Sequence, residues 1–227
     1  MPALPRTDAA PARRTPPSHP DARFWNRIAR RYAARPVDDP AAYEAKLAIM
    51  RALLFERPGA RVVEIGCGTG STALALAPHA ARIRAADVAP AMIDIARAKA
   101  RAAGAVGLAF EVAAVEEMDV APGSQDMVMA HSILHLLPGR SRAIAAAHRW
   151  LRPGGVFVSS TTCLSDTAPW LRPLAPLAGR IGLVPPTLRF FSADELTADI
   201  ETQGFVIERR VRPAPKAALF LVARKPA

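Results

Sequence analysis

The residues best placed to do chemistry in this sequence form a glycine-rich turn. It reads Gly-Cys-Gly-Thr-Gly over residues 66–70 and directly follows the apolar run Val62–Ile65, which contains one acid, Glu64. Glycine allows positive φ angles and lets a ligand approach the backbone closely. Ligands of open α/β sheets bind at the carboxyl ends of strands, where a strand-to-helix turn lies. The turn therefore predicts a site for a nucleotide-like ligand.

The spacing of these glycines separates the classes of nucleotide-binding protein. Dinucleotide-binding proteins use Gly-x-Gly-x-x-Gly, whose backbone N–H groups and helix N-terminus hold a pyrophosphate. Here the spacing is Gly-x-Gly-x-Gly, and Glu64 would repel a pyrophosphate but suits a cationic methionyl end. No Gly-Lys-Ser/Thr follows, which excludes a phosphate-loop nucleoside triphosphatase. The pattern favours a cofactor without phosphate that carries a positive charge.

A second acid, Asp87, stands where the next strand is expected to end, 17 residues after Gly70. A carboxylate at that place can accept hydrogen bonds from both hydroxyls of a ribose. The alternative is an aspartate that caps the next helix, since Pro90 follows closely. The joint occurrence with the glycine turn favours the ribose role.

Strand and helix patterns alternate from residue 61 onwards. Strands are expected at 61–65, in a run ending near 86, and at 108–112, 126–130, 156–162, 205–211 and 217–222. Helical patterns lie between most of them, and two more precede the sheet around 24–32 and 43–54. The alternation predicts an α/β fold with a doubly wound sheet of seven strands, mostly parallel, with a C-terminal antiparallel hairpin and N-terminal helices.

Together these motifs resemble the class I S-adenosylmethionine-dependent methyltransferases. The resemblance covers about residues 61–161 and includes Asp87–Met92, the segment 125–135 and the run Leu-Arg-Pro-Gly-Gly at 151–155. The nearest likeness is to the methyltransferase type 11 group of small-molecule enzymes. The resemblance implies a Rossmann-like fold, S-adenosyl-L-methionine as cofactor, and methyl transfer to a small-molecule acceptor.

The resemblance also assigns cofactor-binding roles, residue by residue. These fall on Tyr32, Glu64, Gly66, Cys67, Gly68, Gly70, Asp87, Val88, Met92, Ala114, Val115, Glu116, Ala130 and His131. Ala114 departs from the family pattern, because many relatives carry there an Asp that accepts from the adenine amino group. Adenine must then be held by backbone groups around Ala114 and Val115, or by Glu116. Tyr32, in an N-terminal helical stripe, is a candidate for the cofactor's carboxylate, with plain core packing as the alternative.

Methyl transfer from a sulfonium is an in-line displacement, in which the enzyme mainly aligns the reacting atoms. A general base is needed only where the acceptor must lose a proton. His131 follows the fourth strand, and His135 shares its face if that stretch is helical. With ordinary pKa values near ~6.5 both are candidate catalytic bases, the alternative being that they shape the pocket by packing. No cluster with metal-ligand spacing occurs, so no metal is predicted.

We expect residues 21–227 to form a single domain after a disordered tail at 1–20 that is rich in Pro, Ala and Arg. Residues 21–58 are expected to form a helical cap. The long apolar, Pro-rich segment 165–191 is expected as a loop on the acceptor side. It would cover the pocket or touch a membrane surface, with packing on the sheet as the alternative. Its apolar residues hint at a hydrophobic acceptor.

The formal net charge of +10 raises the question of anionic partners, because basic surfaces attract nucleic acids and anionic lipids. However, 26 of the 30 basic residues are Arg scattered among Ala and Pro, so a nucleic-acid partner is not favoured. No apolar stretch approaches the ~20 residues of a membrane-spanning helix, and no signal-peptide pattern is present. A cytoplasmic protein is expected, with peripheral membrane contact left open and no particular oligomeric state indicated.

Other functions compete with a small-molecule methyltransferase. A domain that binds the cofactor without catalysis is motivated by Ala114 and by the absence of a firm base. An RNA-directed methyltransferase is motivated by the charge, but no Asn-Pro-Pro-Tyr motif supports an amino-directed nucleic-acid enzyme. A nicotinamide oxidoreductase is disfavoured by the glycine spacing and by Glu64.

Overall fold

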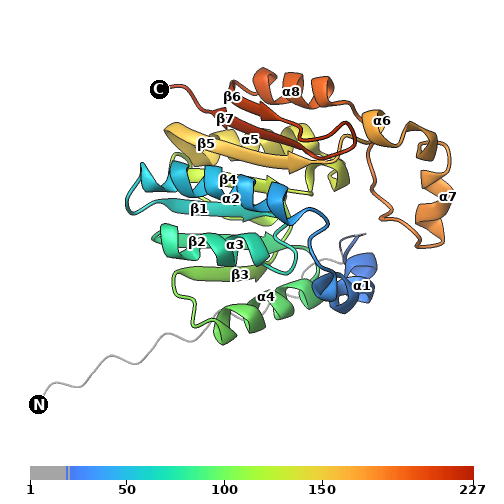
Figure 1. Cartoon of the computed structure of the whole chain (residues 1–227), viewed down its shortest axis with the longest axis horizontal. Coiled ribbons are helices and arrows are strands. Elements are labelled where there is room, and N and C mark those ends of the chain that lie inside the picture. The colour runs from blue at the N-terminus through green and yellow to red at the C-terminus, as the bar shows by residue number, and fades with distance from the viewer. Residues whose placement is uncertain (1–18, 20) are drawn as a thin grey trace, which may run out of the picture.

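The computed structural model describes residue 19 and residues 21–227. Residues 1–18 and 20 lie outside the described part, and the prediction of a disordered N-terminal tail falls almost entirely on them. A seven-stranded sheet in the order β3-β2-β1-β4-β5-β7-β6 runs through the molecule (Figure 1). Its strands are β1 (Arg61–Ile65), β2 (Arg82–Asp87), β3 (Leu108–Val112), β4 (Gln125–His131), β5 (Leu151–Thr161), β6 (Val206–Val211) and β7 (Leu219–Arg224).

Helices cover both faces of this sheet. On one face α2 (Pro40–Phe55), α3 (Ser71–Leu76) and α4 (Pro90–Ala102) pack onto the strands, and on the other α5 (Arg140–Trp150) and α8 (Ala193–Thr202) do so. Alternate residues of β1 point to opposite faces, so Val62 belongs to one apolar core and Val63 to the other. The remaining helices are α1 (Ala22–Ala34), η1 (Ala77–His79), η2 (Val115–Glu117), η3 (Leu134–Leu136), α6 (Leu164–Thr167), η4 (Pro169–Leu171) and α7 (Ala175–Arg180).

The strand pairing confirms the predicted fold class. Strands β1 to β5 pair in parallel, whereas β7 runs antiparallel to both β5 and β6. Parallel neighbours place their carboxyl ends along one edge of the sheet, which brings the turn after β1 beside the ends of β2 and β4. The result is the doubly wound, Rossmann-like sheet with a C-terminal antiparallel hairpin.

Two sequence predictions about this sheet are wrong in detail. The strand expected at 156–162 begins earlier, at Leu151, so the run at 151–155 forms the first part of β5. The pairing shifts there, from Gln125 opposite Leu151 to Met127 opposite Val156, and Gly154 has a φ of 73°. A glycine with positive φ lets the strand bulge without breaking. In addition, His131 is the last residue of β4 rather than the residue after it.

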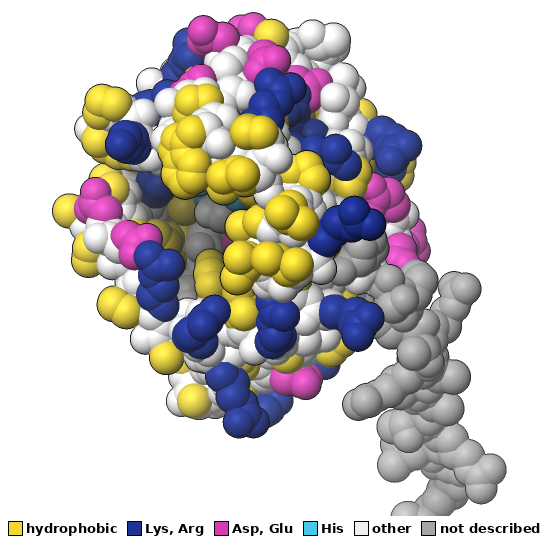
Figure 2. Space-filling view, turned by 90° about the vertical axis from the view of Figure 1, so that its right-hand side faces the viewer, with side chains coloured by type: hydrophobic (Ala, Val, Ile, Leu, Met, Phe, Trp, Pro, Cys, Tyr) yellow, Lys and Arg dark blue, Asp and Glu magenta, His cyan; other side chains and the backbone are white. Residues whose placement is uncertain are grey.

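The segment 165–191 is not a plain loop, because it contains the end of α6, η4 and α7. Pro169 and Pro176 lie in the first turns of η4 and α7, where the missing N–H of proline costs nothing. This segment and α1 lie at the end of the molecule where the parallel strands have their carboxyl ends (Figure 1). The face at this end is hollowed (Figure 2). Among the described helices none is both long and apolar enough to cross a membrane.

Candidate cofactor and acceptor site

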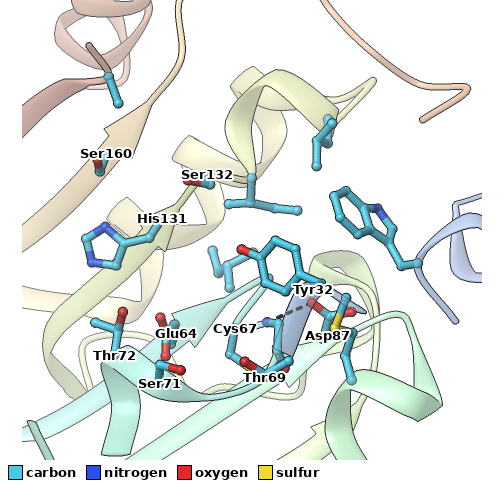
Figure 3. Close-up of a pocket in the computed structure, with 18 of the residues that line it drawn as sticks. Tyr32, Glu64, Cys67, Thr69, Ser71, Thr72, Asp87, His131, Ser132 and Ser160 are labelled. Atoms are coloured by element: carbon cyan, nitrogen blue, oxygen red, sulfur yellow. Dashed lines mark hydrogen bonds between the residues drawn. The ribbon is translucent and has the colours of Figure 1, made fainter. Parts of the chain in front are cut away.

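A cavity of about 640 Å³ opens at the carboxyl ends of β1, β2 and β4 (Figure 3). Small-molecule sites in proteins measure about 300–1,000 Å³, so the cavity has the size of a ligand site. Its walls come from the glycine turn, the ends of β2, β4 and β5, and helices α1, α2 and α4. The topology therefore joins segments far apart in the sequence around one space.

The three glycines of the turn have φ angles of 66°, 53° and 72°, in the region that favours glycine. A Cβ atom on Gly66 would lie 2.5 Å from Cγ1 of Ile133, and one on Gly70 would lie 2.8 Å from the ring of Phe110. Packing thus requires glycine at both positions. A Cβ atom on Gly68 would meet nothing nearer than the Tyr32 ring at 4.0 Å. This middle residue lines the open cavity, where a ligand can approach its backbone.

Asp87, the last residue of β2, holds the turn in place. The Gly68 N–H donates to its Oδ2 and the Ala89 N–H to its Oδ1, both at 2.9 Å. Burial raises the pKa of this carboxyl group, and the two N–H groups oppose that rise. Helix α4 is capped at Ala89 without a side-chain bond, so Asp87 does not act as the N-cap that the alternative interpretation required. Each carboxylate oxygen keeps a lone pair for a ligand hydroxyl.

Glu64 is a buried acid without a compensating partner. It is 2% exposed, and its Oε2 atom has no hydrogen-bond partner within the described residues. Burial raises its pKa to about 8, the backbone N–H of Ala73 opposes this, and the charge of Asp87 adds to it. Unpaired buried carboxyl groups are costly, and a cation in the adjoining cavity would compensate this one.

A polar group of three residues, Lys46, Ser160 and His131, lies across the cavity from the glycine turn. The Lys46 ammonium group, on α2, donates to Oγ of Ser160 at 2.9 Å, and burial lowers the pKa of Lys46. His131, at the end of β4, lies between Ser160 and Glu64 (Figure 3). Burial and the nearby Lys46 charge lower the pKa of His131 to about 4. The imidazole is therefore neutral at pH 7 and is a weak base.

Helix α1 supplies the aromatic wall of the cavity. The Tyr32 ring reaches into the space above the glycine turn, and Trp25 packs edge-to-face against it at 6.0 Å (Figure 3). The Ala91 N–H donates to Oδ1 of Asn26 at 2.9 Å, which ties α1 to α4. Tyr32 remains 46% exposed, so the alternative that it is simple core is wrong.

With this geometry in place, comparison with known proteins decides the class. The sequence pattern of the family described as "Methyltransferase domain" matches residues 62–155, the stretch that contains the glycine turn, Asp87 and His131. Residues 62–155 of this chain therefore match a methyltransferase domain, within a sheet of the order described above. The prediction of an S-adenosylmethionine-dependent methyltransferase is thereby confirmed at the level of the family. The narrower likeness to the type 11 group stays a prediction.

Individual relatives agree with the family match. The chain is 36% identical over 121 residues to a trans-aconitate 2-methyltransferase of Deinococcus radiodurans, covering 52% of this chain and 44% of the relative. It is 35% identical over 105 residues to a ubiquinone biosynthesis O-methyltransferase of Xanthomonas campestris pv. campestris, covering 46% and 44%. The chain thus spans less than half the length of these curated relatives. An S-adenosylmethionine-dependent methyltransferase from Mesorhizobium loti shares the fold, with a TM-score of 0.64, 22% identity and coverage of 79% and 97%.

Three of the sequence-predicted site residues do not line the cavity of the methyltransferase domain. His135 lies in η3 and does not line the cavity. The prediction that it shares a face with His131 required one continuous helix, and Ser132, with a φ of 54°, interrupts it. Burial lowers the pKa of His135 to about 4, and its Nδ1 is buried without a partner within the described residues. This placement contradicts a catalytic role for His135. Gly70 and Ala130 support the site from behind, as the N-cap of α3 and as a buried residue of β4.

The remaining predicted residues do line the cavity, including the group expected at the adenine. The Ala114 N–H is already occupied, because it donates to the Glu117 carboxylate at 2.9 Å. Val115 begins η2, and the N–H of a first helical residue has no partner inside the helix. Glu116 is exposed at the rim. Backbone groups around Ala114 and Val115 were expected to hold adenine. Of these two N–H groups, the one at Val115 is therefore available.

Several polar lining residues escaped the sequence analysis. Lys46 and Tyr43 lie on α2, whose stripe of apolar residues indicated only packing. The hydroxyl oxygen of Tyr43 lies 3.4 Å from the hydroxyl oxygen of Thr72. The Lys99 ammonium group, on α4, donates to Oγ1 of Thr69 at 3.0 Å. No local sequence motif marks Lys46, Tyr43 or Lys99, because α2 and α4 come beside the glycine turn only in the folded chain.

The electrostatic link between Lys46 and His131 gives a direct prediction. The change Lys46→Met should raise the pKa of the His131 imidazole from about 4, because it removes a neighbouring positive charge. Histidine NMR signals followed during an acid titration measure this shift. Lys99→Met is the matched control, since Lys99 lines the cavity but does not contribute to the pKa of His131. An unchanged or lower midpoint in Lys46→Met would contradict the arrangement.

Proposed function

We propose that this chain transfers a methyl group from S-adenosylmethionine to a small organic acceptor. The observation that carries the proposal is the buried Oε2 of Glu64, which lacks a partner within the described residues and adjoins a glycine-lined cavity. A positively charged ligand without phosphate fits this acid because it favours the ionised carboxylate, whereas a pyrophosphate would gain no attraction from it. Asp87, with free lone pairs toward the same cavity, fits a ribose.

In this proposal, different lining residues bind different parts of the cofactor. Asp87 holds the ribose hydroxyls, Glu64 the cationic methionyl end, and the Tyr32 hydroxyl the carboxylate. The Val115 N–H and the apolar side chains of Val88 and Met92 hold the adenine. When bound, S-adenosylmethionine supplies a methyl group on a sulfonium, which is an excellent leaving group. The protein's own contribution is to bind, to align and to exclude water.

On the acceptor side we propose roles for His131, Lys46 and Ser160. Lys46 and Ser160 offer hydrogen-bond donors to an acceptor oxygen. A neutral imidazole with a pKa of about 4 is a weak proton acceptor, so His131 suits acceptors that need little help from a base, such as an anionic oxygen. A hydrophobic acceptor body is supported by the exposed apolar residues of segment 165–191 near the cavity mouth, although none of that segment lines the cavity.

The domain boundaries belong to the same proposal. We propose that residues 21–227 act as one domain, because α1 and α2 of the cap at 21–58 supply cavity walls rather than a separate unit. The segment 165–191 is proposed as the acceptor-side rim. A cytoplasmic location stays a prediction.

The test is release of S-adenosylhomocysteine from S-adenosylmethionine in the presence of candidate acceptors. Trans-aconitate represents the acceptor named for one relative, a hydrophobic phenol offers an oxygen acceptor as the name O-methyltransferase of the other requires, and transfer RNA represents the nucleic-acid alternative. We expect acceptor-dependent release with at least one small molecule and none with RNA. Tight cofactor binding without transfer to any acceptor would instead favour a binding domain.

A further inference from the structure

An exposed apolar surface lies on the rim of segment 165–191. Five large apolar side chains within fourteen residues are each more than half exposed, and we call them the α7 rim: Trp170, Leu174, Leu177, Ile181 and Leu183. Single exposed apolar residues are normal, but a contiguous group of this size indicates an interaction surface. Tryptophan with leucine and isoleucine is also the combination that sits at the boundary between water and lipid.

Exposed arginines outnumber acidic residues around the α7 rim. Residues 167–193 contain three arginines and no acidic residue, and all three, Arg172, Arg180 and Arg189, are exposed. Residues 22–37, which include α1, contain five exposed arginines, one of which, Arg35, pairs with the exposed Asp38 that follows this stretch. Positive charge beside exposed apolar residues complements an anionic lipid surface.

The two stretches form one continuous face around the cavity. The Arg27 guanidinium donates to the Gly182 carbonyl oxygen, and the Thr187 hydroxyl hydrogen-bonds the buried carboxyl group of Asp21. Figure 2 shows this face with hydrophobic side chains beside the hollow and Lys and Arg side chains below it. A flat anionic surface could contact the apolar rim and the arginines together while the cavity mouth faces it.

We propose that this face docks on an anionic lipid surface, with the α7 rim in the headgroup region and the cavity mouth turned toward the bilayer. A nucleic acid would use the arginines but would leave the exposed leucines and isoleucine without a partner. A second copy of this chain in a two-fold contact would bring arginines against arginines. The inference that a hydrophobic acceptor enters from the lipid rests on the proposed function, whereas the docking itself does not.

Sedimentation of the full chain with vesicles tests the docking. We expect binding to vesicles that contain phosphatidylglycerol, weaker binding to vesicles of phosphatidylcholine alone, and loss of binding as salt rises. The double variant Leu177→Glu with Ile181→Glu should bind anionic vesicles at least about tenfold more weakly. Phe55→Glu with Val106→Glu is the matched control, because these exposed apolar residues precede β1 and β3 at the opposite end of the sheet.

The arginines are tested separately. Arg172→Ala with Arg180→Ala should weaken binding and flatten its salt dependence, whereas Arg101→Ala, exposed on α4, should not. Unchanged cofactor affinity in the rim variants shows that they remain folded. No binding to anionic vesicles, or equal binding by the rim and control variants, would overturn the proposal. So would a dimer of the wild-type chain that the rim variants dissociate. A chain that binds vesicles but transfers no methyl group would contradict only the proposed function.

Discussion

Asp87→Ala should weaken S-adenosylmethionine binding by ~1.5–3 kcal/mol, about ten- to 150-fold, because a hydrogen bond to a charged group contributes about that much. The variant removes the acceptor proposed for the ribose hydroxyls. It also removes the acceptor for the Gly68 and Ala89 N–H groups, so the glycine turn loses the side chain that holds it. Calorimetric titration with the cofactor measures the loss.

Two controls separate binding from folding in this prediction. Asp94→Ala removes an aspartate whose side chain is 76% exposed on α4, and it should leave affinity unchanged. Thermal unfolding of Asp87→Ala establishes that the variant is folded at the titration temperature. Equal affinity of wild type and a folded Asp87→Ala protein would remove Asp87 from the site and, with it, the ribose assignment.

Glu64→Gln should abolish a proton release that accompanies cofactor binding. In the free protein the pKa of Glu64 is about 8, so most molecules carry the proton at pH 7. A cationic ligand favours the ionised form and lowers that pKa, so binding at pH 7 expels the proton. Affinity should therefore rise with pH up to about 8 and level off above it. The amino group of the cofactor titrates in a similar pH range. The difference between wild type and Glu64→Gln therefore isolates the protons that Glu64 releases.

The same substitution changes the pH dependence of stability. Because the pKa of Glu64 is raised above its ordinary 4.5 in the folded chain, the free energy of unfolding should fall as pH rises from 4.5 to 8. Glu64→Gln should lack this fall, and Glu201→Gln, exposed on α8, should retain it.

Titrations in two buffers of different ionisation enthalpy count the protons released on binding. The same proton release in wild type and Glu64→Gln would contradict the proposed contact.

Much of the fold could be predicted from local patterns. Strand runs such as 61–65 and 108–112 coincide with β1 and β3, because strands covered on both faces form short, mainly apolar runs that can be recognised in the sequence. The glycine turn and Asp87 were identifiable because backbone conformation and strand position restrict residue type there. Figure 3 places Asp87 beside the turn, hydrogen-bonded to it.

The parts that sequence could not provide depend on contacts across the fold. Lys46 reaches Ser160 from a helix 114 positions earlier, and nothing in its own neighbourhood marks it. The direction of the His135 side chain depends on Ser132, whose backbone is left-handed. Because Ser132 is not a glycine, its residue type did not indicate this conformation. The arginines of α1 and the α7 rim are adjacent only because Arg27 meets Gly182 in the folded chain.

The central claim is that the glycine-lined cavity holds a cationic cofactor without phosphate. Calorimetric titration of the wild-type chain with S-adenosylmethionine and, separately, with NADH tests it most directly. The account predicts micromolar binding of S-adenosylmethionine and no binding of NADH, because a cationic ligand gains the ionised Glu64 carboxylate, whereas a pyrophosphate gains no attraction from Glu64 in either protonation state. Binding of NADH, or no binding of S-adenosylmethionine by the folded protein, would contradict it.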